Sequence, residues 1–193
     1  MAMLWTPFQS YACKNIFLLD GQSNMFGRRG VINNNWTRYI PPKYRSQSSI
    51  LRLNVALTWK VACEPLHRDM DKNKTCGVGP SMSFANYVLE KAFNIGVIGL
   101  VPCAFGGSLI ADWRQGSPLY DRHLKRSKAA LEDGGEIRGL LWYQGESDTK
   151  KQEDAELYKK RVEVFFNVVS TYLSLPEPSN YSGGIDIGHR SIF

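Results

Sequence analysis

The sequence predicts an α/β domain built on a mostly parallel β-sheet. The chain has 193 residues, of which 43% are hydrophobic and 22% are charged; these fractions are ordinary for a globular domain and exclude a disordered or collagen-like chain. Short apolar runs alternate with longer segments of helical period, which is the pattern of βαβ units. No apolar run approaches the ~18 residues of a membrane-spanning helix. We expect one domain over residues 1–175, followed by a divergent tail at 176–193.

Three apolar runs are predicted to be strands of this sheet. The first, residues 16–19, is continuous and apolar, as a strand buried on both faces should be. Residues 97–101 and 137–142 are the next two, and residues 50–55 are a weaker candidate. Each of the three main runs leads into a turn rich in Gly, Asn or Ser. Because the carboxyl ends of parallel strands share one edge of a sheet, we expect these turns to meet where open α/β sheets bind ligands.

Helical periodicity predicts three helices between and after these strands. The first opens at Pro80, a residue suited to a first helical turn, and ends near Gly96. The second begins at the N-cap Ser117 and stops at Gly134. The third covers about 152–173. Its predicted buried residues are Leu157, Val164, Phe165, Val168 and Tyr172.

The net charge of +6 is concentrated in one part of the chain. Residues 24–75 contain ten basic and three acidic residues, a local charge of +7. The basic residues are dispersed through loop-like sequence, which favours a solvated loop region. A flavodoxin-like nucleotide or polyanion binder is an alternative, but the chain lacks a phosphate-cradling GxxxxGK loop.

The cysteine and histidine spacings predict no metal site. No cysteine pair has zinc-knuckle spacing, and the three histidines form no HExxH motif. Cys63 and Cys76 are close enough in sequence to bridge, but buried free thiols are the expectation in a reducing compartment. The first fifteen residues show no signal-peptide pattern. We therefore expect a soluble, cytoplasmic protein by default.

Several polar residues follow the predicted strands, and each has a structural alternative. Ser23 is a candidate nucleophile or a helix N-cap. Gly106 either forms a tight turn or presents its N–H to a substrate carbonyl. Gln144 is a candidate amide donor to an oxyanion or a turn cap. Glu146 and Asp148 form an acidic pair, for which an N-cap role of Asp148 in the next helix is a sufficient explanation.

In this order, these segments resemble the SGNH (GDSL-like) hydrolase superfamily. The resemblance is carried by 18–25 (LLDGQSNM), 77–80 (GVGP), 101–108 (VPCAFGGS) and 142–148 (WYQGESD), and extends over about 15–175. The most similar branch is that of sialate O-acetylesterase-like proteins, which includes plant carbohydrate acetylesterases. The resemblance implies a three-layer α/β/α flavodoxin-like fold with a mostly parallel sheet, whose last strand is missing from this chain.

The resemblance also implies a function and a set of site residues. Ser23 matches the nucleophile that attacks an acetyl ester. The N–H groups of Ser23 and Gly106 and the Gln144 amide match the oxyanion hole. The implied substrate is an acetylated sugar or polysaccharide, cleaved without metal or organic cofactor and without nucleic-acid or membrane partners. The oligomeric state is left open.

A serine nucleophile needs a base, and the motifs above do not supply one. Asp186 and His189 have the family's D-x-x-H spacing but arrive early, with no strand or helix before them. The competing hypothesis is that the chain diverges near Pro176 and is a catalytically impaired fragment or pseudoenzyme. His123, expected to be exposed on a basic helix, and His67, without an evident orienting carboxylate, are poor substitutes.

The missing last strand has a structural consequence. The strand at 137–142 becomes an edge with unpaired backbone groups beside an apolar sequence. We therefore expect low stability or self-association.

Overall fold

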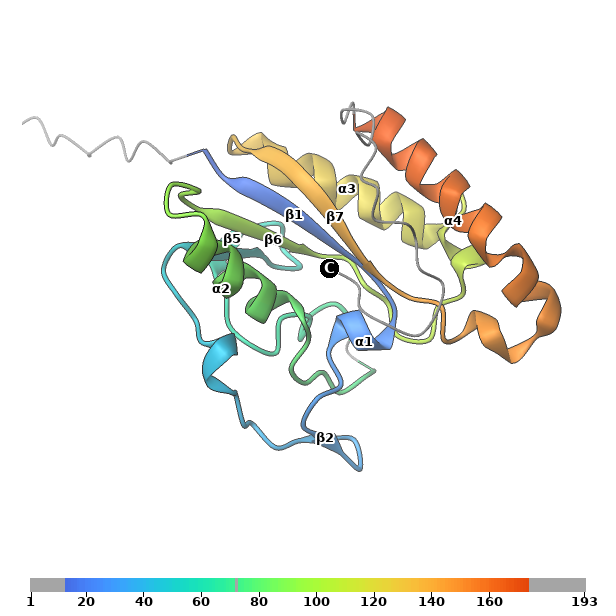
Figure 1. Cartoon of the computed structure of the whole chain (residues 1–193), viewed down its shortest axis with the longest axis horizontal. Helices are drawn as coiled ribbons and strands as arrows, with labels where there is room; N and C mark the ends of the chain where they lie inside the picture. Colours follow the sequence, from blue (N-terminus) through green and yellow to red (C-terminus); the bar gives the residue numbers. More distant parts are fainter. Residues whose placement is uncertain (1–12, 72, 174–193) are drawn as a thin grey trace, which may run out of the picture.

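The computed structural model describes residues 13–71 and 73–173, whose elements form one five-stranded sheet with helices on both faces (Figure 1). The strand order is β5-β4-β6-β1-β7. The central strand β1 (Asn15–Gly21) pairs in parallel with β6 (Ile98–Pro102) on one side and β7 (Glu136–Tyr143) on the other. The predicted α/β class and mostly parallel sheet are confirmed.

The other side of the sheet is formed by β4 (Ile50–Leu53) and β5 (Trp59–Val61). β4 runs parallel to β6, whereas β5 pairs with β4 in the antiparallel direction and forms that edge. The sequence analysis missed β5, because its three residues are half-buried or exposed and show no apolar run. A short hairpin of β2 (Val31–Ile32) and β3 (Asn35–Trp36) lies outside this sheet.

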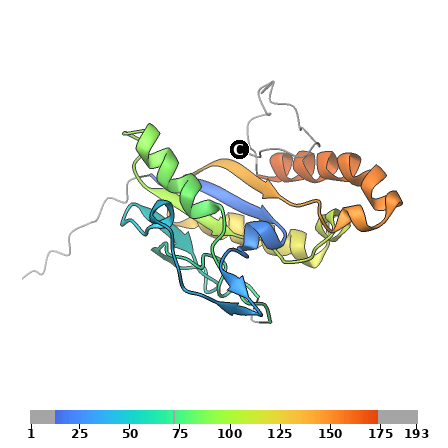
Figure 2. The same cartoon turned by 60° about the horizontal axis from the view of Figure 1, so that its bottom comes forward.

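Helices α2 and α3 lie on opposite faces of the sheet (Figure 2). Side chains alternate along β1, so Leu19 packs with the buried face of α2 (Ser81–Lys91), whereas Ile16 and Leu18 pack toward α3 (Pro118–Glu132). This alternation gives the three-layer arrangement that the resemblance implied.

Helix α4 (Gln152–Tyr172) turns a different stripe toward the core from the one predicted. Leu157, Val164 and Tyr172 are 37%, 55% and 43% exposed, so the prediction that they are buried was wrong. The helix buries Phe165, as predicted, together with Val162 and Val169, which were not predicted. Apolar residues occur on more than one side of this helix, and the aromatic cluster formed by Trp113, Trp142 and Phe165 selects the stripe that faces inward.

Four short helices connect these elements. They are α1 (Ser23–Phe26), η1 (Pro42–Tyr44), η2 (Ile110–Trp113) and η3 (Asp148–Lys150). In the part of the chain that the structure describes, no helix is long and apolar enough to cross a membrane.

Within the described residues, β7 pairs only with β1 and forms the second edge of the sheet. The expectation that the family's last strand is missing stays a prediction, because the residues after 173 lie outside the described part of the chain. The expected self-association through that edge stays a prediction.

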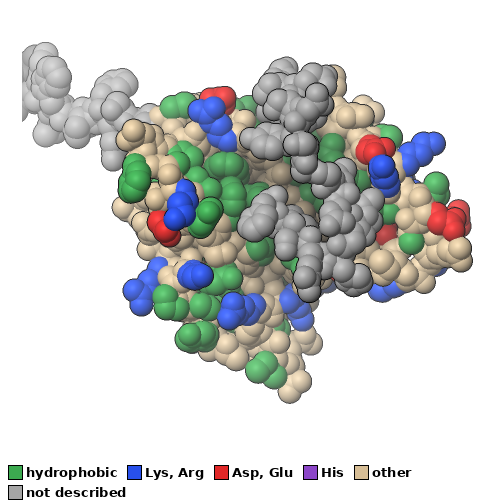
Figure 3. All heavy atoms as spheres, in the orientation of Figure 1, with side chains coloured by type: hydrophobic (Ala, Val, Ile, Leu, Met, Phe, Trp, Pro, Cys, Tyr) green, Lys and Arg blue, Asp and Glu red, His purple; other side chains and the backbone are tan. Residues whose placement is uncertain are grey.

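The basic region is not uniformly a solvated loop. Arg52 lies on β4, is 2% exposed, forms an ion pair with Asp69 and donates from Nε to the Leu66 carbonyl oxygen. Other Lys and Arg side chains on the face shown in Figure 3 form separate spots among apolar and uncharged atoms, not one patch. All four cysteines, including Cys63 and Cys76, are free.

Candidate functional site

The turns that follow β1, β6 and β7 are joined to one another at the carboxyl edge of the sheet. The Gln22 N–H donates to the Tyr143 carbonyl oxygen at 2.9 Å, and the Phe105 N–H donates to the Gly21 carbonyl oxygen at 2.9 Å. Three of these four residues directly precede a predicted site residue in the chain, and Gly21 lies two positions before Ser23. The three turns therefore form one local structure, as their positions in a parallel sheet require.

Ser23 is the first residue of α1, directly beyond the end of β1. The buried side chains of Met25 and Phe26 anchor this short helix in the core, and the Gly27 N–H closes it by donating to the Ser23 carbonyl oxygen at 3.0 Å. The Ser23 side chain is half-buried, and neither its hydroxyl nor its N–H is hydrogen-bonded within the described residues. An unengaged hydroxyl at this edge remains available to a ligand.

Gly106 lies in the turn after β6, beside a lysine ammonium. Its carbonyl oxygen accepts a hydrogen bond from Lys74 Nζ, while its N–H makes no hydrogen bond to any described residue. The Lys74 ammonium lies 4.9 Å from the centre of the Phe105 ring, and a Cβ on Gly106 would approach the Lys74 side chain to 3.2 Å. The turn thus combines a free backbone N–H with a neighbouring positive charge.

Gln144, the residue after β7, is buried and its carboxamide bridges two turns. Nε2 donates to the Ser108 carbonyl oxygen at 3.0 Å and to the Asp148 carboxylate, with a weaker 3.4 Å contact to Gln22 Oε1. Gln144 Oε1 is buried without a hydrogen-bond partner in the described part of the chain. This orientation points the amide donor, not the acceptor, at a carboxylate.

Asp148 has a different role from the N-cap that the sequence suggested. Helix α4 is preceded by Lys151 and has no side-chain cap, so the N-cap prediction was wrong. The Asp148 carboxylate instead accepts from the Ile110 N–H at 3.1 Å and from the Gln144 amide. Burial raises the pKa of Asp148 more than these hydrogen bonds lower it.

Two further residues lie at this carboxyl edge of the sheet and were missed by the sequence analysis. Gln22, 3% exposed, accepts from the Ser147 N–H at 3.2 Å through Oε1. Asn24 donates from Nδ2 to Glu146 Oε1. Both residues flank Ser23 in the chain, and both connect its turn to the one after β7. Their polar side chains next to a candidate nucleophile were the available signal.

No histidine of the described part is hydrogen-bonded to the Ser23 hydroxyl. His123 is 0% exposed, so the expectation of an exposed surface role was wrong; it lies against Asp20. His67 is 1% exposed, and burial lowers its pKa to about 3. The predicted catalytic base His189 and its partner Asp186 lie outside the described residues. The burial of Asp20 could have been predicted from the sequence, since Asp20 continues the buried run of β1.

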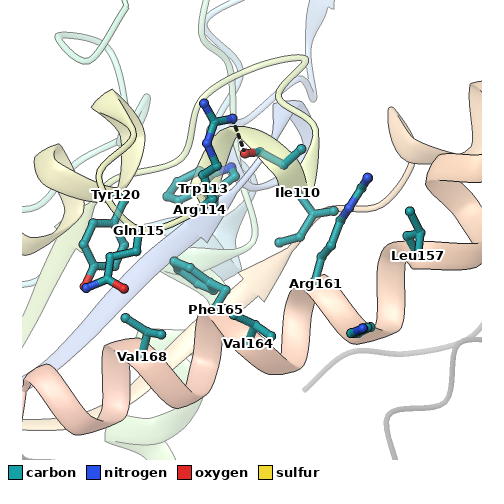
Figure 4. Close-up of a pocket in the computed structure, with 12 residues that line it drawn as sticks. Ile110, Trp113, Arg114, Gln115, Tyr120, Leu157, Arg161, Val164, Phe165 and Val168 are labelled. Carbon is teal, nitrogen blue, oxygen red and sulfur yellow. Dashed lines mark hydrogen bonds between the residues drawn. The ribbon is translucent and has the colours of Figure 1, made fainter.

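A pocket of about 500 Å³ lies apart from this site, between η2 and α4 (Figure 4). Trp113, Tyr120 and Phe165 contribute aromatic rings to its lining, and Arg114 and Arg161 lie at it as well. None of Ser23, Gly106 and Gln144 lines it.

Taken together, the site offers a free hydroxyl, two free backbone N–H groups and a buried carboxamide at one sheet edge. A nucleophile beside N–H donors is the arrangement that acyl transfer uses, because the donors stabilise charge that develops on a carbonyl oxygen.

Comparison with known proteins also indicates an esterase. A family model described as carbohydrate esterase, sialic acid-specific acetylesterase matches residues 13–188. A protein of Arabidopsis thaliana, named as a probable carbohydrate esterase, is 48% identical over an alignment of 168 residues that covers 83% of this chain. This chain spans 65% of that relative's length. The X-ray structure of the Arabidopsis protein matches with a TM-score of 0.82 and 46% identity, over 86% of this chain and 71% of that one.

More distant structures share the fold. The crystal structure of NanS matches with a TM-score of 0.59 and 19% identity, over 84% of this chain and 64% of that one. A carbohydrate acetylesterase of Xanthomonas citri matches with a TM-score of 0.55 and 16% identity, over 83% of this chain and 39% of that one. At these identities the likeness shows the fold alone.

Proposed function

The chain belongs to the carbohydrate esterase family of sialic acid-specific acetylesterases, and on that premise we propose that it removes O-acetyl groups from carbohydrate with Ser23 as nucleophile. The observation that supports this most directly is that the Ser23 hydroxyl and the N–H groups of Ser23 and Gly106 are all unengaged among the described residues, at one edge of the sheet.

In the proposed reaction, Ser23 Oγ attacks the acetyl carbonyl carbon while its proton passes to a base. The carbonyl oxygen becomes negatively charged, and the Ser23 and Gly106 N–H groups donate to it. Collapse of this intermediate expels the sugar hydroxyl and leaves an acetyl group on Ser23, which water then removes.

Gln144 is proposed as the third donor. Its amide is shared among the Ser108 carbonyl oxygen, the Asp148 carboxylate and the more distant Gln22 oxygen. A hydrogen directed toward an oxyanion therefore has to leave one of these acceptors when substrate binds. The buried bridge keeps the carboxamide at the edge where the oxyanion would form.

For the base we propose Asp186 and His189, on their sequence spacing alone. The alternative is that this chain lacks a working base and, as an impaired fragment or pseudoenzyme, at most binds acetylated carbohydrate. That alternative rests on the early position of Asp186 and His189 in the sequence, where no strand or helix is predicted before them.

The test is acyl-enzyme formation on the full chain with 4-nitrophenyl acetate. We expect a burst of one 4-nitrophenolate per chain followed by turnover, both absent in Ser23→Ala. Ser83→Ala is the matched control, because Ser83 lies on α2 and, among the residues that the structure describes, its hydroxyl bonds only to the Pro80 carbonyl oxygen. Turnover that survives Ser23→Ala unchanged would contradict the assignment of the nucleophile.

His189→Ala separates the two proposals about the base. A loss of turnover with retained folding supports the active esterase. If the unmodified chain shows no burst but binds an acetylated sugar, and His189→Ala changes nothing, the impaired form is supported.

A further inference from the structure

Beneath the candidate site, a buried carboxylate from β1 contacts a buried histidine from α3. Asp20 Oδ2 lies 3.0 Å from His123 Nδ1, and both side chains are 0% exposed. Within the described residues, neither oxygen of Asp20 and neither ring nitrogen of His123 has a partner that meets hydrogen-bond geometry, so their contact is an ion-pair contact by distance. A fully buried carboxylate needs a compensating charge, because it has lost its hydration. His123 is the cation positioned to supply it.

The pair lies under both turns that carry the proposed catalytic groups. Asp20 lies near the end of β1, three residues before Ser23 at the start of α1. The loop that carries Gly106 begins at Cys103, whose N–H donates to the Leu19 carbonyl oxygen at 2.9 Å. The side-chain ligand atoms of Asp20, Cys103 and His123 all lie within 4.8 Å of one another.

Helix α3 holds the same loop through a second charged residue. Arg122 donates from Nη2 to the Cys103 carbonyl oxygen at 2.6 Å. Arg126, one turn later, donates to the carbonyl oxygens of Pro102 and Leu53 at 2.7 and 2.6 Å, at the carboxyl ends of β6 and β4. Consecutive turns of α3 therefore hold the ends of β6 and β4 by hydrogen bonds from Arg122 and Arg126, and the end of β1 by the ion-pair contact of His123.

The surroundings of His123 favour its charged form. It faces Asp20 from β1, Cys103 from the loop after β6 and, across the aromatic cluster, the uncharged ring of Phe165 at 5.9 Å. Burial lowers the pKa of His123, but the neighbouring Asp20 carboxylate raises it more, to about 10.

We propose that Asp20 and His123 are positioning residues: their ion pair fixes the Ser23 turn and the Gly106 loop against α3, so that the hydroxyl and the N–H donors keep one mutual orientation. His123 is not the missing base, because it is fully buried and makes no hydrogen bond to Ser23 in the described structure. The inference rests on the proposed function only in taking the positioned groups to be catalytic. The pair itself is testable without catalysis.

The first experiment measures the state of the pair in the unaltered chain. In ¹⁵N-histidine NMR spectra at pH 8, we expect one histidine with both ring nitrogens protonated, and we expect this signature to disappear in Asp20→Asn. A neutral His123 ring at pH 8 would overturn the proposal. Stoichiometric transition metal in the purified protein, lost in Asp20→Asn, would also overturn it, since the three side chains would then be ligands.

The second experiment measures local order by hydrogen exchange. In Asp20→Asn we expect segments 20–26 and 103–108 to exchange at least about tenfold faster relative to α2 than in the unaltered chain. Val169→Ala is the matched control, because Val169 is a 1% exposed core residue of α4 outside the site. If both variants change exchange in the same proportion throughout, the pair has only a general stabilising role and the proposal fails.

A kinetic readout links the pair to catalysis. Where the unaltered chain hydrolyses 4-nitrophenyl acetate, we expect Asp20→Asn to lower kcat at least about tenfold with little change in KM, and Val169→Ala to leave kcat unchanged at temperatures where both are folded. Equal kcat in Asp20→Asn and the unaltered chain would overturn the positioning role. If the unaltered chain shows no esterase activity, the proposed function fails, while the NMR and exchange results still decide whether the pair holds the turns.

Discussion

Replacing Gly21 by alanine tests how tightly the Ser23 turn is built. Gly21 is the last residue of β1 and has a φ of +127°, which a residue with a Cβ rarely adopts. An ideal Cβ there would lie 2.2 Å from the Tyr143 carbonyl oxygen and 2.6 Å from its carbonyl carbon. That oxygen accepts the Gln22 N–H, so the clash falls on the bond that joins the Ser23 turn to β7.

The expected cost has two parts. The positive φ costs an L-residue about 1–2 kcal/mol. The overlap is with backbone, which cannot rotate away, so β1 and β7 must separate locally, and overpacking of this kind costs about 1–3 kcal/mol. We therefore expect Gly21→Ala to lower the free energy of unfolding by about 2–5 kcal/mol.

Gly116→Ala is the matched control. Gly116 has a φ of +77°, but its Cβ would meet nothing within 4 Å, so only the first part of the cost applies. Urea unfolding followed by tryptophan fluorescence gives both values, provided that the m-value is unchanged. If the two variants differ by less than about 0.5 kcal/mol, the close approach of the two strands is not a constraint and the argument is wrong.

Three further predictions concern single side chains. Gln144→Met should lower kcat for ester hydrolysis by about 10²–10³-fold, the usual loss for one oxyanion donor, and an unchanged kcat would exclude that role. Burial raises the pKa of Glu64 to about 7, above its ordinary 4.5, so the native state binds the extra proton and stability falls as pH rises from 4.5 to 7. As pH rises from 4.5 to 7, the difference in unfolding free energy between Glu64→Gln and the unaltered chain should therefore shift by about 2–3 kcal/mol in favour of the variant. Urea titrations measure this difference, and a difference that stays constant with pH would contradict the prediction. Burial lowers the pKa of His67 to about 3, so the buried neutral ring contributes to stability above pH 6.5, and this contribution is lost as pH falls toward 3. The ring signals of His67 in NMR should therefore not titrate near pH 6.5.

Much of the fold was predictable because local pattern and tertiary packing agree. The apolar run at 16–19 became β1, the run at 97–101 became β6 and the segment at 137–142 became β7, each with boundaries shifted by at most two residues. Ser117 caps α3 as expected, with its Oγ accepting the Tyr120 N–H. Buried parallel strands and capped helices leave strong signals because burial and capping each demand particular residue types.

The misses occurred where the deciding partner is distant in sequence. Val164 and Val169 are both valines on α4, yet one is 55% and the other 1% exposed, because only the aromatic cluster selects the buried stripe. His123 follows a lysine- and arginine-rich pattern typical of an exposed helix face. Its burial depends on Asp20, which lies more than a hundred residues earlier in the chain.

The sequence alone determined the order of the strands' turns and the residue types that they carry, because a parallel βαβ chain brings its strand ends to one edge. Only the tertiary structure decided which of those groups are free and which are engaged. Ser23 and Gly106 keep unbonded donors, whereas the Gln144 amide is held by Ser108 and Asp148. The physical reason is that hydrogen bonds and ion pairs are set by distances of a few ångströms between groups far apart in the chain, and spacing along the sequence does not specify such distances.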